Sequence, residues 1–422
     1  MTVDEELGLM WRCVYAHYIL GWKVNKISQH ERILRAKVSE LLQRAVAIGM
    51  LQIVGRPPRE TGLETAIIDK YGLKDAMVVL APGLVASGEA GDDDRDDNFK
   101  TRLSALAAAP AQYVQAAIKR VAMQRSEQGK PVRIGLACGR TLYAVTARFD
   151  DRFLADPELR GANLELYPLN VAYGPQLGYQ LPNVLVSNVY MKWTPADENV
   201  EQLKAYNLTI PIEAIETTDE EVDREQRLRA RLEPYGMWAA FEAARAADIF
   251  LLGIGSPKAI NPGYRGVFEG LGGSFEGIED IADGEINYQL FNRRGFLDDL
   301  APSDDTHGVN LVAVAKANKK ITAVSLRDLR RASMNPDKYV IAVAFGQEKA
   351  EAVDASLGRN LLCYNVLITD ETIASKLVTE QELAAHLQLR PTPAPSSAQP
   401  ASHRLGRNSL APASAKNGGP AR

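Results

Sequence analysis

Two glycine-containing turns carry the residue types that could bind a negatively charged group. Gly139-Arg140-Thr141 stands between a run expected to form a strand and one expected to form a helix. Backbone N–H groups at the start of a helix, with a hydroxyl and a guanidinium beside them, suit a phosphate. Gly255-Ser256 follows another apolar run and offers a second place where a ligand can approach the backbone. Taken alone, either turn is also consistent with an ordinary tight connection.

Lys349 could supply a point charge to the same site. It begins a predicted helix after the apolar run at 340–344. A solvated surface lysine is the simpler interpretation. The two turns and Lys349 all follow predicted strands, and open α/β sheets bind ligands at the carboxyl ends of their strands. The sequence therefore predicts that these residues share one edge of a sheet.

The elements that must position these residues alternate between strands and helices. Short apolar runs predict strands at 76–80, 132–137, 164–169, 249–254, 320–325, 339–344 and 363–368. Helical patterns occupy 11–32, with a break near Gly21, and then 35–48, 63–71, 98–128, 142–148 and 215–247. Such alternation predicts an α/β fold whose parallel sheet has helices on both faces.

The composition is that of an ordinary globular protein. Of 422 residues, 46% are hydrophobic and 24% are charged, which excludes a wholly disordered or fibrous chain. No apolar run approaches the ~20 residues that cross a bilayer, and the acidic start lacks the pattern of a signal peptide. We therefore expect a cytoplasmic protein without a membrane partner. Cys13, Cys138 and Cys363 lie far apart, so we expect neither a disulfide framework nor a metal site.

The net charge of −4 conceals a basic segment near the amino terminus. Residues 11–59 contain nine Lys and Arg against two Glu, a net charge of +7 that leaves −11 for the rest of the chain. A basic block joined to an acidic body predicts a nucleic-acid-binding head on a different kind of domain. Arg56-Pro57-Pro58-Arg59 breaks regular structure and marks the expected link between the two.

The basic head has the pattern of a helix-turn-helix. One predicted helix ends near Arg32, and the next runs over 35–48 with one apolar face formed by Val38, Leu41, Leu42, Ala45 and Ile48. That second helix would enter the major groove of DNA. The residues that would then face DNA are Arg35, Ala36, Ser39 and Gln43, with Lys37 and Arg44 near phosphates. A small helical bundle with a solvated basic face explains the same pattern.

Two further segments complete the predicted organisation. Residues 51–54 alternate like a short strand, which would make the head winged. From 390 to 422 the chain is rich in Pro, Ala, Ser and Gly and has no acidic residue, so it cannot bury enough apolar surface to fold. We thus expect a helix-turn-helix domain at 1–59, an effector and oligomerisation domain at 60–389, and a disordered tail at 390–422.

Several segments, taken in order, resemble one family of bacterial regulators. Residues 33–45 (ILRAKVSELLQRA) are similar to the recognition helix of the SorC family of sugar-responsive transcription regulators, which are DeoR-like. The segments that resemble the body of the family are LETAIIDKYGLKDAMVV (63–79), RIGLACGRTLYAV (133–145), LYPLN (166–170), ADIFLLGIGSP (247–257), residues 321–331, VIAVAFGQEKAEA (340–352) and VLITDETIA (366–374). Motifs in the right order over about 12–378 are more specific than any one of them.

The resemblance implies a fold, a site and a function. The body would be a doubly wound α/β effector domain of the NagB/RpiA/CoA-transferase-like type, without a cofactor or catalytic residues. It would bind a phosphorylated sugar or polyol, and the head would bind operator DNA as part of a homodimer or homotetramer. The pocket residues that the resemblance implies are Gly139, Arg140, Thr141, Gly255, Ser256 and Lys349, followed by Asn170, Glu285 and Asp370. Glu285 could accept hydrogen bonds from sugar hydroxyls or could cap the next helix.

Three head positions depart from the family pattern. Leu34 stands where the family usually has a capping serine, Glu40 where a basic residue is common, and Glu31-Arg32 replaces the usual Leu-Gly. These departures leave open a sensor or scaffold whose head mediates dimerisation without binding DNA. The segment at 170–235 is also longer than is usual in the family.

An enzyme on the same scaffold, such as a sugar-phosphate isomerase or deaminase, is the other alternative. Such chemistry needs a positioned general base, usually a carboxylate or a histidine. None of the five histidines falls in a strand-end motif; they are His17, His30, His307, His386 and His403. Catalysis would therefore depend on Asp or Glu alone.

Overall fold

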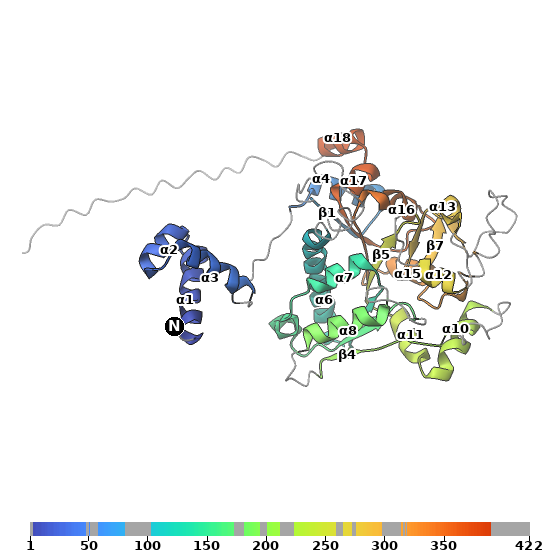
Figure 1. Cartoon of the computed structure of the whole chain (residues 1–422). Helices are drawn as coiled ribbons and strands as arrows, with labels where there is room; N and C mark the ends of the chain where they lie inside the picture. The colour runs from blue at the N-terminus through green and yellow to red at the C-terminus, as the bar shows by residue number, and fades with distance from the viewer. Residues whose placement is uncertain are drawn as a thin grey trace, which may run out of the picture.

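The computed structural model describes most of the chain (Figure 1). The described residues are 3–47, 50, 58–80, 103–172, 181–194, 201–211, 223–258, 265–271, 276–297, 314, 317 and 319–389. The strand predicted at 51–54, His307, His403 and the tail at 390–422 lie outside them. Within the described part of the chain, no helix has the length and apolarity needed to cross a membrane.

The amino-terminal segment folds around a small hydrophobic core of its own. Its elements are α1 (Val3–Val14), a π-helical turn (Tyr15–Ile19), α2 (Val24–Glu31) and α3 (Arg35–Ala47). Val38, Leu41, Leu42 and Ala45 of α3 are buried in this core, which confirms these members of the predicted apolar face. Its last member, Ile48, lies outside the described residues. Ile27 of α2 and Met10 of α1 fill the space between the helices. We call residues 3–47 the head.

The rest of the described chain, which we call the body, is built on a parallel sheet. The strand order is β1-β10-β9-β5-β2-β3-β4, and every pairing along this path is parallel. The strands are β1 (Asp75–Val79), β2 (Val132–Leu136), β3 (Leu164–Pro168), β4 (Leu203–Ala205), β5 (Ile249–Gly255), β9 (Tyr339–Ala344) and β10 (Val366–Asp370). All six residues of β9 are buried, as expected for a strand covered on both faces.

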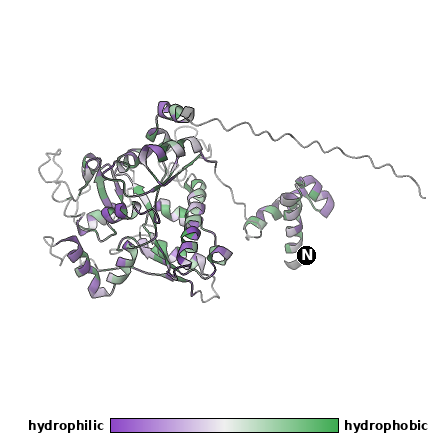
Figure 2. Cartoon of the chain, turned by 180° about the vertical axis from the view of Figure 1, so that it is seen from behind, coloured by the Kyte–Doolittle hydropathy of each residue, from purple (hydrophilic) through white to green (hydrophobic). Residues whose placement is uncertain are grey.

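Helices pack along the sheet and complete the α/β architecture that the sequence predicts. They are α4 (Thr61–Tyr71), α6 (Ala108–Ser126), α7 (Arg140–Ala147), α8 (Pro182–Trp193), α10 (Arg224–Leu232), α11 (Trp238–Arg245), α12 (Arg265–Gly270), α13 (Ile278–Ile281), α15 (Leu326–Ser333), α16 (Ala350–Ser356), α17 (Glu371–Leu377) and α18 (Glu380–Leu389). α7 packs against β5 and β9, and α8 against β3 and β4. In Figure 2 these helices carry both hydrophilic and hydrophobic residues, as helices that cover a sheet with one side must.

An antiparallel extension that the sequence does not predict leaves the sheet at β5. β6 (Gly284–Ile286) pairs with the end of β5, and β7 (Gln289–Asn292) and β8 (Gly295–Phe296) follow. The segment at 170–235 contributes α8, the edge strand β4 and α10. Both additions lie beside the strands that carry the predicted site residues.

Two predicted elements are wrong in detail. The helix expected over 215–247 is divided into α10 and α11 by the turn Glu233–Tyr235 and by Gly236, which has φ +70°. Pro234 and a glycine in the left-handed region stop a helix for steric reasons. The strand expected over 320–325 does not form; Ala323 makes an isolated bridge to Asn170. Ser325 instead caps α15 through a reciprocal pair of hydrogen bonds with Asp328.

Candidate functional site

The first half of the site is the turn between β2 and α7. Gly139 has φ +118°, a conformation that a side chain would strain. It is the N-cap residue of α7, and because glycine has no side chain it cannot cap the first turn of that helix. Backbone N–H groups of a first turn that lacks a side-chain cap are available to an anion. Thr141, in the same turn, is buried with its hydroxyl directed at Lys349.

Lys349 reaches this turn from a different strand. It ends the 3-10 turn Gln347–Lys349 that follows β9, and its Nζ donates to Thr141 Oγ1 at 3.0 Å. The interpretation of Lys349 as an ordinary solvated lysine is therefore wrong. Burial lowers the pKa of Lys349, and the nearby Arg140 guanidinium lowers it further, although three carboxyl groups oppose the shift. A partly buried ammonium group with a lowered pKa that bonds to a hydroxyl is a candidate ligand contact.

Glu285 faces Lys349 from the antiparallel extension. It pairs with Gly255 across β5 and β6, and a Cβ atom at position 255 would lie 2.4 Å from Glu285 Oε1. Glycine is therefore required there for the carboxyl group to lie over the strand. Burial raises the pKa of Glu285 to about 7, despite the opposing effects of the Tyr288 N–H and of Lys349. Near neutral pH this group can both donate and accept hydrogen bonds.

Glu285 caps none of the described helices, although capping is one of its two predicted roles. Its Oε2 accepts a hydrogen bond from Tyr288 N at 2.9 Å, inside the β6–β7 hairpin. The carboxyl group thereby fixes the hairpin and keeps its other oxygen on the side of Gly255. Its predicted role as an acceptor for ligand hydroxyls remains a prediction.

Asn170 lies at the carboxyl end of β3 with a hydrogen-bonding atom to spare. The side chain is fully buried, and its Nδ2 lies 3.5 Å from Cys138 Sγ. Its Oδ1 has no hydrogen-bond partner in the described structure. Because an unsatisfied buried acceptor costs about 1–3 kcal/mol, this oxygen is a candidate acceptor for a ligand hydroxyl.

Two residues of this cluster, Cys138 and Tyr288, were not predicted. The Cys138 thiol donates to Tyr288 Oη at 2.8 Å. Burial raises the pKa of Cys138 to about 11, so the sulfur is a thiol and not a nucleophilic thiolate at neutral pH. Together the two side chains connect the end of β2 to the β6–β7 hairpin.

The hairpin turn that carries Tyr288 is strained. Asn287 and Tyr288 have φ values of +53° and +65°, the left-handed pair of a type I′ turn. Asparagine tolerates this region, whereas a tyrosine there costs about 1–2 kcal/mol. The typical sequence of such turns is Asn-Gly, so Asn287-Tyr288 did not predict a hairpin. Strain at a residue that points into a polar cluster suggests a functional role.

Polar contacts hold the strained hairpin in place. Asn287 Nδ2 donates to the carbonyl oxygens of Leu169 and Val324 at 3.1 and 3.0 Å. Gln289 bonds to the Val324 carbonyl and to Leu326 N at the start of α15. The contacts between the hairpin and α15 therefore determine where Tyr288 lies.

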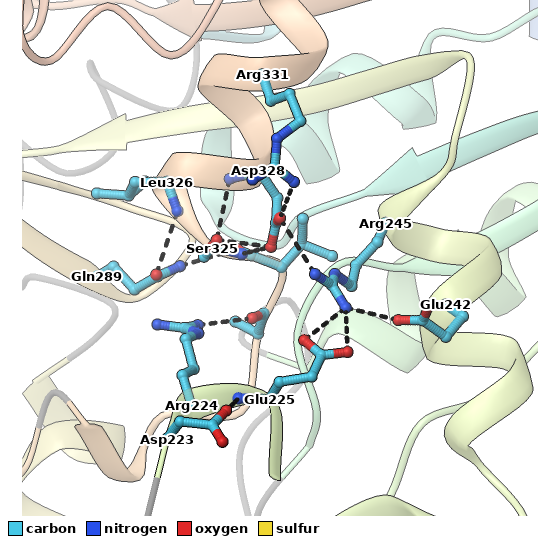
Figure 3. Close-up of polar contacts among 12 residues, drawn as sticks. Asp223, Arg224, Glu225, Glu242, Arg245, Gln289, Ser325, Leu326, Asp328 and Arg331 are labelled. Carbon is cyan, nitrogen blue, oxygen red and sulfur yellow. Dashed lines mark hydrogen bonds and ion pairs between the residues drawn. The ribbon is translucent and has the colours of Figure 1, made fainter. Parts of the chain in front are cut away.

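An ionic network then fixes the start of α15 (Figure 3). Asp328 accepts hydrogen bonds from Ser325 and Arg245, and Arg245 also binds Glu225 and Glu242 of α10 and α11. Burial would raise the pKa of Asp328, but the Ser325 hydroxyl and the Arg245 guanidinium outweigh it and hold the pKa below its ordinary value. Asp328 is thus a carboxylate that anchors three helices beside the hairpin.

Asp370 and Ser256 have structural partners. Asp370 caps α17 through Ile373 N at 3.1 Å and accepts from Gly346 N at 2.9 Å, in the turn that leads to Lys349. Ser256 Oγ accepts from Lys258 N at 3.3 Å. Asp370 therefore positions the loop that carries Lys349. Direct ligand contact by Ser256 or Asp370 remains a prediction.

The predicted DNA-facing residues of α3 fall into two groups. Arg35, Ser39 and Gln43 are exposed, as expected of residues that read bases. Lys37 and Arg44 are instead held by Glu6 of α1, at 3.4 and 2.9 Å. The sequence predicts that both side chains are free for DNA phosphates. It does not predict their ion pairs with Glu6, because the helical pattern begins at residue 11 whereas α1 begins at Val3. Lys37 also bonds to Glu40 at 2.7 Å.

The turn between α2 and α3 explains one departure in the head. Arg32 has φ +55° at the end of α2, a left-handed position that glycine occupies without strain. Arg12 Nε donates to Glu31 Oε2 at 3.0 Å, which links α1 to the end of α2. The turn is therefore made without glycine.

The assembled site can bind an anion beside hydroxyl groups. Lys349, Arg140 and the first turn of α7 supply positive charge and N–H donors, whereas Glu285 and Asn170 supply acceptors. In the described part of the chain, no group of three His, Cys, Asp or Glu side chains is arranged to hold a metal ion. A phosphate ester on a polyhydroxyl carbon chain matches both halves of this arrangement.

Comparisons with known proteins match this architecture. Residues 225–379 match the family model described as "Putative sugar-binding domain", which includes β5, the hairpin, β9 and β10. No curated protein matches the sequence significantly. The full-length sorbitol operon regulator SorC from Klebsiella pneumoniae has a similar structure, with a TM-score of 0.53 at 18% identity over 88% of this chain and 98% of that one.

Two further solved structures align with three quarters of this chain. A DeoR family transcriptional regulator from Listeria monocytogenes has a TM-score of 0.47 at 18% identity, over 75% of this chain and 99% of that one. A probable sor operon regulator from Shigella flexneri has a TM-score of 0.46 at 17% identity, over 75% and 99%. At 18% identity and a TM-score of 0.53, the Klebsiella structure shows that the two proteins share a fold.

Proposed function

We propose that this protein is a transcription regulator that binds DNA through its head and a phosphorylated sugar or polyol through its body. The observation that carries the proposal is the contact of Lys349 with Thr141 at the start of α7, opposite Glu285. The resemblance to the sorbitol operon regulator and the match to a sugar-binding domain model support it. We also propose the division into a DNA-binding domain at 1–59, an effector domain at 60–389 and a tail at 390–422.

The phosphate would bind at the start of α7. The hydrogen bond between Lys349 and Thr141 joins the loop after β9 to the turn after β2, and Arg140 adds a second positive charge. A phosphate dianion between these groups would accept from Nζ, from the threonine hydroxyl and from backbone N–H groups. It would also restore the ordinary pKa of Lys349, because a neighbouring negative charge stabilises the ammonium form.

The sugar hydroxyls would face the hairpin side of the cluster. Asn170 Oδ1 lacks a partner, and Glu285 can accept from one hydroxyl or donate to another. Tyr288 would then border the ligand, since its hydroxyl already contacts Cys138 at the end of β2. Discrimination between sugars would arise here, because a missing or inverted hydroxyl leaves Asn170 unsatisfied.

The ligand site is connected to the segment that leads to the head. Gly346 N binds Asp370, the last residue of β10, and β10 pairs with β1. β1 follows α4, and α4 packs against α17 and α18. A ligand that moves Lys349 toward α7 would shift the loop that begins at Gly346. That shift would be transmitted through β10 and β1 to α4. Regulation requires that the ligand favour one arrangement of the heads over another.

Thermal-shift screening tests the ligand half of the proposal. A phosphorylated sugar should raise the unfolding midpoint where the free sugar does not, because only the native state binds it. Lys349→Ala should remove that shift and Thr141→Val should reduce it, whereas Lys258→Ala, at an exposed lysine after β5, should retain it. A shift of full size in both site variants would place the ligand elsewhere.

Fluorescence anisotropy with DNA from upstream of the gene tests the other half. We expect affinity to fall as salt rises, since bound phosphates release counterions. Arg35→Ala should weaken binding by about 1–3 kcal/mol if it contacts a base. Lys130→Ala, at an exposed residue of the body, is the matched control. Absence of binding at low salt would contradict the proposal.

A sugar-phosphate isomerase is the second candidate, and Glu285 is the observation that favours it. A carboxyl group with a pKa of about 7 beside a buried lysine could move a proton between adjacent carbons. Turnover of any phosphorylated sugar that stabilises the protein, lost in Glu285→Gln, would assign that activity. Tight binding without turnover would favour the regulator.

A further inference from the structure

Tyr288 has a backbone conformation that suits glycine better than tyrosine. In the part of the chain that the structure describes, the non-glycine residues with positive φ are Arg32, Asn287 and Tyr288. Arg32 is exposed at the end of α2, and asparagine tolerates the left-handed region. Tyr288 is only 5% exposed and has φ +65°. A large buried side chain is therefore retained at a position where its Cβ atom crowds the backbone.

The Tyr288 ring spans two neighbouring strand ends. The Tyr288 N–H donates to Glu285 Oε2 at 2.9 Å, and that carboxyl group lies over Gly255 of β5. At the far end of the side chain, Tyr288 Oη accepts from the Cys138 thiol at 2.8 Å, just after the end of β2. Because β2 and β5 pair side by side, the ring lies across their carboxyl ends. A ligand cannot occupy that volume while the ring is there.

The charged groups of the site are more accessible than this ring. Gly139, Arg140, Glu285 and Lys349 are all partly exposed, whereas Tyr288 is buried. A ligand that enters from solvent meets the charged groups first and the ring last. The end of the ligand that is remote from its phosphate would then meet a rigid and uncharged surface.

The hairpin does not need the ring to hold its place. Asn287 and Gln289 anchor it through hydrogen bonds to the Val324 carbonyl oxygen. The bond from Tyr288 to Glu285 uses the backbone N–H, which any residue but proline supplies. Glycine at position 288 would complete the same turn without strain. Residues held in strained conformations cluster at ligand sites, so the benefit of the ring lies in the site.

We propose that the Tyr288 ring is a specificity-determining group that limits the length of the ligand. The phosphate binds at the start of α7, the carbon chain runs past Glu285, and its far end meets the ring. A rigid ring excludes a longer chain by steric overlap, which is how sites reject ligands that are too large. The ligand class is therefore a phosphorylated polyol or sugar of limited chain length. This inference rests on the proposed phosphate site.

A series of phosphorylated polyols of increasing length tests the limit. Full-length protein would be titrated by calorimetry with inorganic phosphate, glycerol 3-phosphate, ribitol 5-phosphate and mannitol 1-phosphate. In the unmodified protein, affinity should fall about tenfold or more at one step of the series. In Tyr288→Gly that fall should move to a longer member, and the affinity for inorganic phosphate should not change. A limit at the same member in both proteins, or equal affinity for all members in the unmodified protein, would overturn the proposal.

Two further variants separate the ring from the backbone. Tyr288→Ala removes the same ring but keeps the left-handed strain, so it should share the longer limit and unfold at a lower temperature than Tyr288→Gly. Tyr288→Phe keeps the ring and should keep the original limit. A longer limit in Tyr288→Phe would mean that the contact with Cys138, and not the ring, excludes the ligand.

Phenol provides a rescue that a merely structural role would not show. In Tyr288→Gly it should occupy the volume left by the ring, as small aromatic molecules do in engineered cavities, and restore the original limit. Tyr288→Leu leaves a smaller hole and should move the limit less, which keeps the test open if Tyr288→Gly does not fold. An unmoved limit in Tyr288→Leu together with no effect of phenol would contradict the proposal.

Failure of the proposed function would give a different result. If neither inorganic phosphate nor any polyol phosphate binds the unmodified protein, the phosphate site is wrong and the length limit is wrong with it. If inorganic phosphate binds both proteins equally and the limit does not move, the phosphate site stands and the role of Tyr288 alone is contradicted.

Discussion

The charged side chains at the two ends of the parallel sheet have different kinds of bonding partner. At the amino ends, Asp248 pairs with Arg125 and accepts from Arg133 N at 3.0 Å, and Arg133 binds Glu165 at 3.2 Å. At the carboxyl ends, Lys349 bonds to the hydroxyl of Thr141, and Glu285 bonds to a backbone N–H. Charges at the amino ends are therefore satisfied by one another, whereas those at the carboxyl ends retain capacity to bind.

The difference indicates which end serves structure and which serves a ligand. A buried charge is tolerated when a partner and hydrogen bonds compensate for its lost hydration, and Asp248 has both. The carboxyl ends combine a lysine of lowered pKa, a carboxyl group of raised pKa and an unpartnered amide oxygen. Such shifts are typical of ligand sites. A bound anion would stabilise the ammonium form of Lys349 and the protonated form of Glu285.

The largest expected effect is at Lys349. Replacement by Met should lower the affinity for a phosphorylated sugar about 100-fold, because a hydrogen bond to a charged group contributes about 1.5–3 kcal/mol. The same change should leave the unfolding free energy unchanged or raise it by about 1 kcal/mol, since it removes a buried charge. Calorimetric titration and denaturant unfolding measure the two quantities. A strongly destabilised variant with normal ligand affinity would reverse the assignment.

The opposite outcome is expected at Asp248. Asp248→Asn should lower the unfolding free energy by about 2 kcal/mol, because Arg125 loses its buried partner while remaining partly hydrated. Ligand affinity should not change. Glu233→Gln, which breaks an exposed pair with Arg229, is the control and should leave the free energy of unfolding nearly unchanged. Equal effects from the two substitutions would mean that the amino ends are not held together by this pair.

The third effect is a pH dependence confined to the carboxyl ends. Because the pKa of Glu285 is about 7, the group is neutral below that pH and becomes a carboxylate above it, where it repels an anionic ligand. Affinity should therefore fall, by up to about tenfold, as the pH rises from 6 to 8. Glu285→Gln should bind with little change over this range beyond the ligand's own titration. A dependence that persists in Glu285→Gln would place the titrating group elsewhere.

The stability contribution of Glu285 has the corresponding sign. Its folded pKa lies above the ordinary value of 4.5, so the folded state favours the protonated form. This contribution is complete below about pH 4.5 and is lost as the pH rises through about 7. Glu285→Gln should flatten that part of the stability profile.

The smallest effect is expected at Thr141. Thr141→Val removes the hydroxyl that accepts from Lys349 and should weaken ligand binding by about 1 kcal/mol, or roughly fivefold. Thr141→Ser, which retains the hydroxyl, should restore most of the affinity. If Thr141→Ser binds no better than Thr141→Val, the lost methyl group and not the hydroxyl explains the effect.

The turns of the site were predictable from sequence because strand–glycine–helix patterns are local. Gly139-Arg140-Thr141 and Gly255-Ser256 lie at strand ends as predicted, and Val38, Leu41 and Ala45 of α3 are buried. Periodicity and turn chemistry alone determine these features. The resemblance to a family added Glu285 and Asn170, which no local pattern marks.

The rest of the site depends on contacts between distant segments. Lys349 bonds to Thr141, 208 positions away in sequence. Tyr288 reaches Cys138 through an antiparallel hairpin that lacks the Asn-Gly signal. Glu6 could not be assigned to Lys37 and Arg44 before α1 was known to begin at Val3. Pro234 and Gly236 lie inside the predicted helix at 215–247, and both are residue types that end helices.

The response of DNA binding to a ligand tests the central claim most directly. Full-length protein would be titrated onto labelled upstream DNA by anisotropy, with and without the phosphorylated sugar that gives the largest thermal shift. We predict that the ligand changes the DNA affinity at least tenfold, and that Lys349→Met binds the same DNA but does not respond. A ligand that binds the body tightly and leaves the DNA affinity unchanged would contradict the account.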